Sequence, residues 1–185
     1  DEQVEHAGSI GRRPLPGADL RVVDLNGREV EPGEVGEIWL KADSMMTGYL
    51  DDPDATAAAF DGPWYKTGDV ARMDGDGYLF IVDRTKDIIV TGGENVYSKE
   101  VEDAIAAHPD VVEAAVIGVP HPEWGETVTA KVVLGADAKL TETDIQELLG
   151  ERLARYKIPR SVEFVAELPH TPTGKVKKYE LREER

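Results

Sequence analysis

The sequence of 185 residues contains no cysteine, which excludes disulfide bonds, thiolate chemistry and zinc sites built on cysteine. It contains no run of 18 consecutive apolar residues, so no transmembrane helix is predicted. The first 15 residues are too polar for the apolar core of a secretory signal peptide. These absences are compatible with the cytoplasm, which is the location we expect.

Positive charge is scarce: 21 Lys and Arg stand against 37 Asp and Glu, and the net charge is −16. This balance argues against a general nucleic-acid binder or a protein of anionic membranes, because neutralising phosphates requires Lys and Arg. The deficit is uneven, since residues 150–185 hold nine Lys and Arg and six Asp and Glu. This basic tail fits a local anionic partner and a plain solvated terminus equally well.

The first half of the chain has the pattern of short β-strands joined by turns. Asn26-Gly27 and the segment 74–77 are hairpin-turn signals. The expected strands are residues 20–24, 28–30, 37–40, 69–73 and 78–82, and a short helix is expected over residues 53–60. Together these elements predict a twisted sheet or partial barrel.

The second half alternates strands with amphipathic helices. The expected strands are residues 87–90, 111–119, 127–134 and 161–165. Ser98 is expected to cap one helix. Thr141 and Asp144 form a capping box that is expected to open another helix, which continues through Arg155. Strands interleaved with helices in this way predict a small α/β unit.

The character of the sequence changes near Arg84, inside the charged segment 83–87. This segment is interpreted either as a solvated linker or as a polar hinge between two moving bodies. We therefore predict an α+β protein with a β-rich subdomain over residues 1–84 and a small α/β domain over residues 85–185.

Three further features carry candidate chemistry, each with a plainer alternative. Asp69, at the head of a hairpin, is either a turn residue or a carboxylate that accepts hydrogen bonds from a hydroxyl pair such as a ribose. The pair Gly92-Gly93 forms an ordinary turn or allows the backbone to approach a ligand closely. Lys175 is a solvated loop residue or a mobile charge for a phosphate or carboxylate.

The order and spacing of five short elements are more specific than any one of them. The elements are Gly36-Glu37-Ile38, Thr47-Gly48-Tyr49-Leu50, Thr67-Gly68-Asp69, residues 78–87 running into 92–97, and Thr173-Gly174-Lys175. Over essentially its whole length the chain resembles the adenylate-forming superfamily of acyl-CoA synthetases, peptide-synthetase adenylation domains and firefly luciferases. The segment Arg155-Tyr156-Lys157-Ile158-Pro159 favours the acyl-CoA synthetase branch.

The resemblance implies that this is a C-terminal fragment. Members of the superfamily carry a phosphate-binding loop rich in Ser, Thr and Gly, and later an aromatic-Gly-x-Thr-Glu element, and neither occurs here. Residues 1–84 are then the last part of the large adenylation domain, and residues 85–185 are its mobile lid domain. The missing N-terminal domain is an expected partner, and the fragment alone is expected to be inactive.

The resemblance also implies a two-step ligase reaction. A carboxylate, fatty or other, attacks the α-phosphate of ATP to give an acyl-adenylate, and the thiol of coenzyme A then displaces AMP. By motif match, Asp69 holds the ribose hydroxyls, Arg84 assists at the same nucleotide, and Lys175 bridges the carboxylate and the phosphate. Mg²⁺ on the triphosphate is expected to be held largely by groups outside this fragment.

The same match implies a moving lid. Lys86 takes the position of the hinge, and Gly92-Gly93 is expected to reach the pantetheine channel when the lid turns. A side chain at either glycine would obstruct a narrow path for the thiol.

Two functions of a different class, both non-catalytic, are alternatives to the ligase. One is a non-catalytic module that binds a nucleotide or coenzyme A, and another is a protein-interaction module with an acidic surface. Trp124 could offer its ring to the adenine of coenzyme A, although packing beside its own strand is the favoured interpretation. The four histidines lack the spacing of metal ligands, so no metal site is assigned.

Overall fold

A computed structural model describes residues 6–12, 14 and 16–183. The chain divides into two compact units, Asp1–Lys86 and Asp87–Arg185, which we call unit 1 and unit 2. Each unit combines strands with at least one helix, and the predicted α+β class is confirmed.

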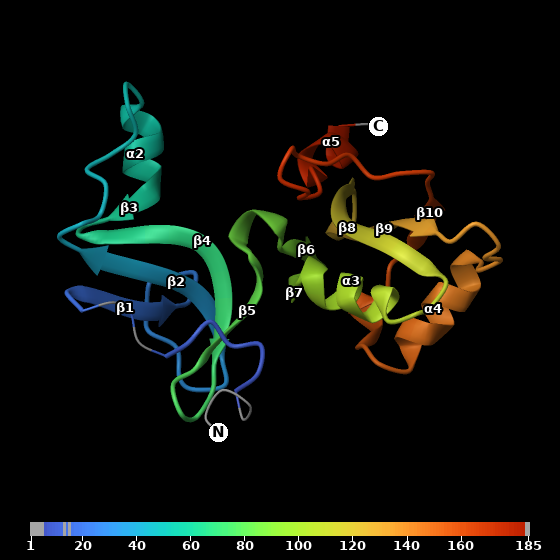
Figure 1. Ribbon diagram of the computed structural model, residues 1–185, viewed down its shortest axis with the longest axis horizontal. Helices are drawn as coiled ribbons and strands as arrows, with labels where there is room; N and C mark the ends of the chain where they lie inside the picture. Colours follow the sequence, from blue (N-terminus) through green and yellow to red (C-terminus); the bar gives the residue numbers. More distant parts are fainter. Residues whose placement is uncertain (1–5, 13, 15, 184–185) are drawn as a thin grey trace. The chain divides into compact units, whose positions relative to one another are not determined.

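Unit 1 is a five-stranded antiparallel sheet with one short helix (Figure 1). Its elements are β1 (Ala18–Val23), β2 (Val35–Ala42), α2 (Pro53–Ala59), β3 (Phe60–Asp61), β4 (Trp64–Met73) and β5 (Leu79–Arg84). The long strand β4 pairs with β2 along one edge, and along the other it pairs first with β3 and then with β5. Four of the five strands predicted in this half form, whereas residues 28–30 contribute only an isolated bridge between Glu29 and Val23. The helix predicted from residue 53 also forms, and it is capped by the Asp52 carboxylate, which accepts a hydrogen bond from Ala55 N at 2.9 Å.

One face of this sheet carries the apolar core of unit 1. The alternation of side chains along paired strands places four buried residues together. They are Val22, Ile38, Ala71 and Leu79. The turn predicted at 74–77 closes β4 onto β5 through a hydrogen bond from Asp74 N to Tyr78 O at 2.9 Å.

Unit 2 is built on a second five-stranded sheet, with β8 and β9 as its longest strands. Its elements, with the short 3₁₀ turns η1 and η2, are η1 (Thr85–Asp87, which begins in unit 1), β6 (Ile89–Thr91), β7 (Glu94–Val96), α3 (Ser98–Ala106), β8 (Val111–His121), β9 (Gly125–Leu134), α4 (Glu142–Gly150), η2 (Arg155–Lys157), β10 (Ser161–Phe164) and α5 (Lys178–Glu183). Strand β10 runs parallel to β9, and the other strand pairs are antiparallel.

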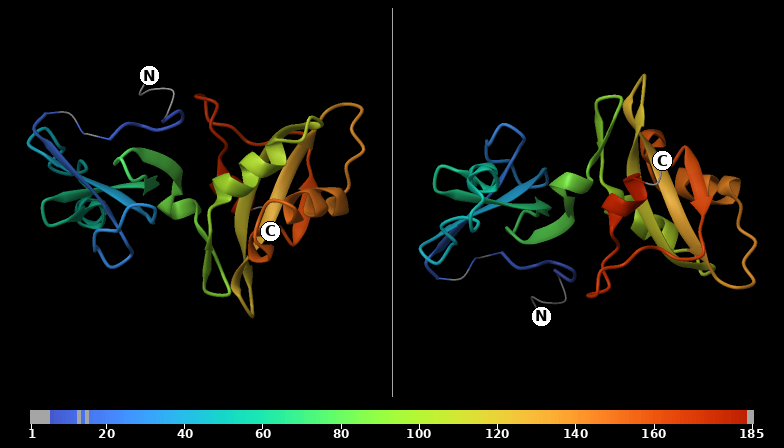
Figure 2. Two further views of the ribbon diagram at one scale, coloured as in Figure 1. Left: turned by 90° about the horizontal axis from the view of Figure 1, so that it is seen from below. Right: turned by 90° about the horizontal axis from the view of Figure 1, so that it is seen from above.

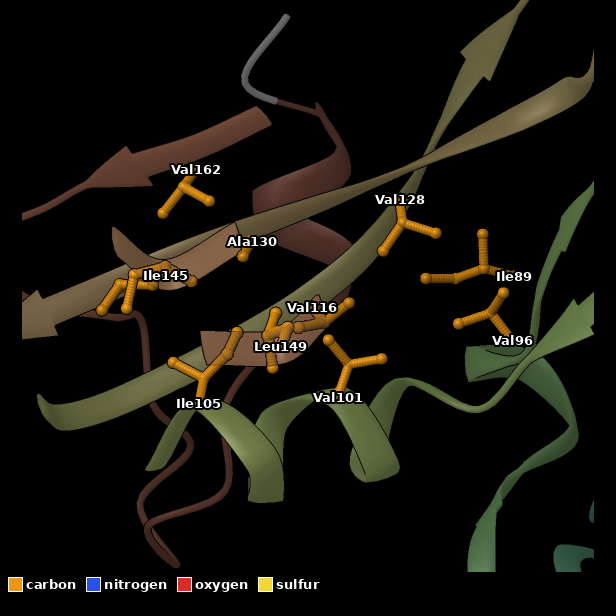
Figure 3. Close-up of a cluster of buried hydrophobic side chains, with 11 residues drawn as sticks. Ile89, Val96, Val101, Ile105, Val116, Val128, Ala130, Ile145, Leu149 and Val162 are labelled. Carbon is orange, nitrogen blue, oxygen red and sulfur yellow. The ribbon is translucent and has the colours of Figure 1, made fainter. Parts of the chain in front are cut away.

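Helices cover both faces of this sheet (Figures 1 and 2). On one face, α3 and α4 contribute Val101, Ile105, Ile145 and Leu149 to a cluster of eleven buried residues (Figure 3). On the other face, Leu181 of α5 joins a smaller buried cluster. Successive residues of β8 face opposite sides of the sheet, and both sides are covered. The sequence of β8 is therefore an almost continuous apolar run.

Three details of the sequence-based prediction for unit 2 are wrong. Ser98 does not cap α3: Tyr97 is the N-cap residue, and the buried Ser98 hydroxyl instead accepts a hydrogen bond from Lys178 Nζ at 2.7 Å. Helix α4 starts with the predicted capping box but ends at Gly150, with Glu151 as its C-cap residue, and the backbone is extended at Ala154, before the predicted end at Arg155. Asp87 belongs to η1 rather than to a strand, and its carboxylate accepts a hydrogen bond from Arg182.

Candidate functional site

In unit 1, the segment Thr67-Gly68-Asp69 forms a bulge in the middle of β4. Its three residues lie opposite the single residue Ile38 of β2, since the register passes from Lys66 to Val70 there. Gly68 has φ +74°, a conformation that side chains other than glycine adopt at a cost. The hydroxyl of Thr67 donates to Ile38 O at 2.8 Å and accepts from Asp69 N at 3.1 Å. The bulge therefore constrains the backbone at Asp69 and fixes the point from which its side chain extends.

Strand β2 supports this bulge through Glu37. One carboxylate oxygen of Glu37 accepts from Gly68 N at 3.0 Å, and the other accepts from the indole of Trp39 at 2.9 Å. The guanidinium carbon of Arg21 lies 5.1 Å from the centre of the Trp39 ring and 3.9 Å from that of Trp64. A chain of cation–π and hydrogen-bond contacts thus holds the bulge from one side.

Arg84 lies directly opposite Asp69, at the end of β5. Its Nε atom is 3.2 Å from Oδ1 of Asp69, and the side chains are 52% and 36% exposed. Within the described part of the chain, Oδ2 of Asp69 accepts no hydrogen bond. The pair therefore presents a carboxylate acceptor beside a guanidinium at the surface, an arrangement suited to hydroxyl groups near a phosphate.

Tyr65 precedes this bulge on β4. A hydrogen bond with Tyr49 raises the pKa of the Tyr65 phenol, and the negative charge of Asp69 acts in the same direction. Tyr65 is therefore a neutral phenol at physiological pH, and it adds no charge beside the Asp69 carboxylate.

The charged segment 83–87 is not a uniformly solvated linker. Asp83 is buried, and its carboxylate accepts from Arg84 N at 2.7 Å. Asp87 is also buried, and it binds Arg182 of α5 at 2.9 Å. Each aspartate is thereby fixed within its own unit, and the exposed residues Thr85 and Lys86 lie between them in sequence.

Gly92 and Gly93 form the two-residue turn between β6 and β7. Both have positive φ, +59° and +87°, as a tight hairpin turn of this kind requires. No atom of the described chain lies within 4 Å of a Cβ built on Gly93, and at Gly92 only the ring of Trp124 is reached, at 4.0 Å. Within this chain the turn conformation, rather than crowding, explains both glycines.

Trp124 lies beside this turn, where its carbonyl oxygen accepts a hydrogen bond from Gly92 N at 2.9 Å. Its ring stacks on His121 with centres 4.3 Å apart, and the guanidinium of Arg160 lies 3.3 Å from the ring centre. The contact with His121 agrees with the favoured interpretation, that Trp124 packs beside its own strand. Arg160 was missed, because nothing in the local sequence links it to a residue 36 positions earlier.

Lys175 lies on a small hairpin between β10 and α5. Thr171 N donates to Lys175 O at 2.8 Å, Lys175 N donates to the Thr171 hydroxyl at 3.1 Å, and His170 and Val176 form a bridge at the base. The side chain is exposed, and no residue of the described chain forms an ion pair with it. The structure thus brings Asp69 and Arg84 together, and it places Lys175 on a separate surface loop of unit 2.

Residues 6–12, 14 and 16–183 show neither a metal-binding cluster nor a membrane-spanning helix. No three His, Asp or Glu side chains there gather in a way that could hold a metal ion. None of the helices in that part is long and apolar enough to cross a membrane.

Comparison with known proteins identifies the family. A model described as "AMP-binding enzyme C-terminal domain" matches residues 100–175, and one described as "AMP-binding enzyme" matches residues 1–50. The chain is 44% identical over 183 residues to a feruloyl-CoA synthase of Amycolatopsis, covering 98% of this chain and 37% of that protein. It is also 44% identical over 184 residues to the long-chain-fatty-acid–CoA ligase FadD13 of Mycobacterium tuberculosis, covering 100% of this chain and 36% of that protein.

Solved structures agree. ATP-bound MatB from Rhodopseudomonas palustris matches 95% of this chain with 43% identity and a TM-score of 0.87, over 35% of its own length. The apo structure of MatB matches the same share of this chain, and of its own length, with 44% identity and a TM-score of 0.66. The chain therefore carries the AMP-binding enzyme C-terminal domain and part of the AMP-binding enzyme domain, as its motifs indicated, and the curated relatives it matches include CoA ligases. It spans little more than a third of the length of the curated relatives it matches, and corresponds to their C-terminal part.

Proposed function

We propose that this chain is the C-terminal part of an AMP-forming acyl-CoA ligase. In the first step a carboxylate oxygen attacks the α-phosphorus of ATP, an acyl-adenylate forms, and pyrophosphate leaves. In the second step the sulfur of coenzyme A attacks the acyl carbon, a thioester forms, and AMP leaves with the bonding electrons. The observation that carries the proposal is the pairing of Asp69 with Arg84 in a chain of this family.

In this proposal Asp69 and Arg84 hold the nucleotide through both steps. The carboxylate accepts hydrogen bonds from the two ribose hydroxyls, and the guanidinium stabilises negative charge on the same nucleotide. The support is geometric: the bulge at Gly68 and the contacts of Glu37 fix the backbone beside Asp69 without occupying its Oδ2 atom.

Lys175 acts in the first step only. Its ammonium group stabilises the charge that develops on the α-phosphate and orients the attacking carboxylate. The exposed position on a hairpin, with no ion-pair partner within the described chain, leaves this charge available for a substrate.

We further propose that residues 85–185 form a lid domain, and that residues 1–84 end the large domain. The lid turns at Lys86, within a hinge at residues 84–87. MatB supports this proposal: its ATP-bound and apo structures match the same share of this chain with TM-scores of 0.87 and 0.66. The region that corresponds to this chain therefore has two shapes in that relative. After the turn, Gly92 and Gly93 lie along the pantetheine path, where a hairpin tip without side chains leaves room.

The remaining groups of the reaction belong to the intact enzyme. Mg²⁺ neutralises the triphosphate when it is bound, and we assign no ligand for it in this chain. The carboxylate substrate binds in the N-terminal part of that enzyme.

The experiment uses the intact enzyme and compares Asp69→Asn with Asp19→Asn, an exposed aspartate on β1 that pairs with Lys41. Asp69→Asn should weaken ATP binding about tenfold or more in calorimetry, because hydrogen bonds to a charged acceptor are lost. The loss should be smaller for the 2′,3′-dideoxy analogue, and Asp19→Asn should bind ATP normally. Equal losses for both nucleotides would contradict the ribose contact.

Turnover separates the ligase from a binding module. The wild-type enzyme should catalyse carboxylate-dependent exchange between ATP and pyrophosphate. ATP binding without exchange, across aliphatic and aromatic carboxylates, would favour the non-catalytic nucleotide-binding module instead.

A further inference from the structure

The hairpin that carries Lys175 is a small rigid body of its own. Gly174 N and Thr171 N both bond across it, and the hydroxyls of Thr171 and Thr173 are 2.9 Å apart. Lys177 N also donates to Pro169 O at 2.8 Å, which extends the pairing below the bridge. Lys175 therefore moves with the hairpin as a whole, and its position depends on how the hairpin is attached to unit 2.

Apolar contacts and helix α5 fix the base of this hairpin. Leu168 is buried in the cluster under α5, and Val176 packs against the same cluster. Just after the hairpin, Lys178 Nζ lies 2.6 Å from Glu102 of α3 and 2.7 Å from the Ser98 hydroxyl. The polar contacts of Lys178 locate the start of α5, beyond the hairpin. The hairpin itself rests on apolar packing, which has no directional preference and leaves its tilt weakly determined.

One directional contact joins the hairpin to the sheet. His170 Nε2 lies 2.8 Å from Oε1 of Glu113 on β8, and both side chains are about one-third exposed. Among the described residues, no other side-chain hydrogen bond runs from residues 170–176 to another element. The contact starts one residue before Thr171, whose backbone and hydroxyl hold Lys175.

We propose that His170 is a positioning residue: its hydrogen bond to Glu113 sets the tilt of the hairpin and thereby aims Lys175 during adenylate formation. The inference rests on the proposed function, because it assumes that Lys175 acts at the α-phosphate. It assigns to His170 and Glu113 a role in the first half-reaction and none in the second.

The electrostatic surroundings of His170 give the proposal a signature in pH. The hydrogen bond with Glu113 raises the pKa of the imidazole, and the charges of Glu113 on β8 and Glu167 in the preceding loop add to it. The charged contact is therefore complete below the ordinary pKa of histidine and is lost as the pH rises through the raised value. The rate of adenylate formation should fall as the pH rises through that interval.

The test measures the two half-reactions of the intact enzyme separately by single-turnover kinetics. His170→Ala should slow adenylate formation about 5- to 10-fold, well short of the roughly 10²-fold cost of a 1 Å displacement. Thioester formation from chemically supplied acyl-adenylate should stay within about twofold. His170→Lys, which keeps a cation opposite Glu113, should restore most of the rate and remove the pH step.

Two controls make the result specific. His108→Gln changes a half-buried histidine of the α3–β8 turn and should alter neither half-reaction. Glu113→Gln should slow the first step as much as His170→Ala does, and the double variant should be no slower than either single one. If His170→Ala slows both half-reactions equally, or slows neither while Lys175→Ala still slows the first, the positioning role is wrong. If Lys175→Ala itself has no effect, the proposed function fails instead.

Discussion

The two units place their candidate groups in opposite ways. In unit 1, Asp69 and Arg84 lie on neighbouring strands of one sheet, so the main-chain ladder and the Glu37 contacts determine their separation. In unit 2, the sheet is buried on both faces by helices, and Lys175 lies outside both buried clusters on a surface hairpin. In the function we propose, Asp69 and Arg84 serve both chemical steps and are built into a sheet. Lys175 serves one step only, and it lies on a hairpin that can be brought in and withdrawn.

Replacing Lys175 tests this contrast most directly and should have the largest effect. In the intact enzyme, Lys175→Ala should slow adenylate formation by a factor on the order of 10²–10³, as for the loss of one electrostatic stabiliser of a transition state. Thioester formation from preformed acyl-adenylate should stay near the wild-type rate. Single-turnover kinetics of each step measures both.

Lys139→Ala removes another exposed lysine of unit 2 and should leave both steps unchanged. If Lys175→Ala slowed thioester formation as much as adenylate formation, the lysine would serve the fold or both steps alike, and the contrast with Asp69 would disappear.

The cores of the two units provide the next prediction. Leu149→Ala opens a cavity among the buried residues under α3 and α4 and should lower the free energy of unfolding of unit 2 by about 3 kcal/mol. Its match in unit 1 is Leu79→Ala. Urea titrations followed by NMR should distinguish the unfolding of the two units, because the indoles of Trp39 and Trp64 report on unit 1 and that of Trp124 reports on unit 2. Loss of all three signals at one shifted midpoint would show that the units do not unfold independently.

The smallest expected effect concerns the helix starts. Thr141→Ala removes half of the capping box of α4 and should cost about 1 kcal/mol of stability, whereas Asp52→Ala removes the simpler cap of α2. Hydrogen bonds from Thr141 lower the pKa of Asp144. The stabilisation linked to that carboxylate is therefore present above its ordinary pKa and is lost as the pH falls through the lowered value.

Chemical denaturation at pH 7 and at about pH 3 measures this dependence. The difference between wild type and Thr141→Ala should shrink in acid. An undiminished difference at the lower pH would mean that the Asp144 charge contributes nothing to the cap.

Local features were predictable from the sequence, and long-range ones were not. The capping box at Thr141 and Asp144 involves residues three apart, so composition and spacing identify it. Ser98 has the residue type of a cap, but its actual partner, Lys178, is 80 positions away, and no local pattern indicates that contact. The strands of unit 1 follow from alternation and turn signals in the same local way.

The candidate site shows the same limit. Asp69 and Arg84 were found by motif match, but their pairing depends on a strand register that includes a bulge. Glu37, which supports that bulge from 31 residues away, was missed as a functional residue. The sequence offers one indication of its importance, its place in the Gly36-Glu37-Ile38 element. That element marks the family but predicts no role for Glu37.

The contact between Asp87 and Arg182 also bears on chain connectivity. Asp87 is the first residue of unit 2 and Arg182 belongs to its last helix, so a 2.9 Å contact brings the two ends of about a hundred residues side by side. Ends that meet in this way can be joined by a short Gly/Ser linker, with new ends opened at the exposed turn around Asp137. Such a circular permutant would keep every strand pair of the sheet while changing the order in which the strands are synthesised.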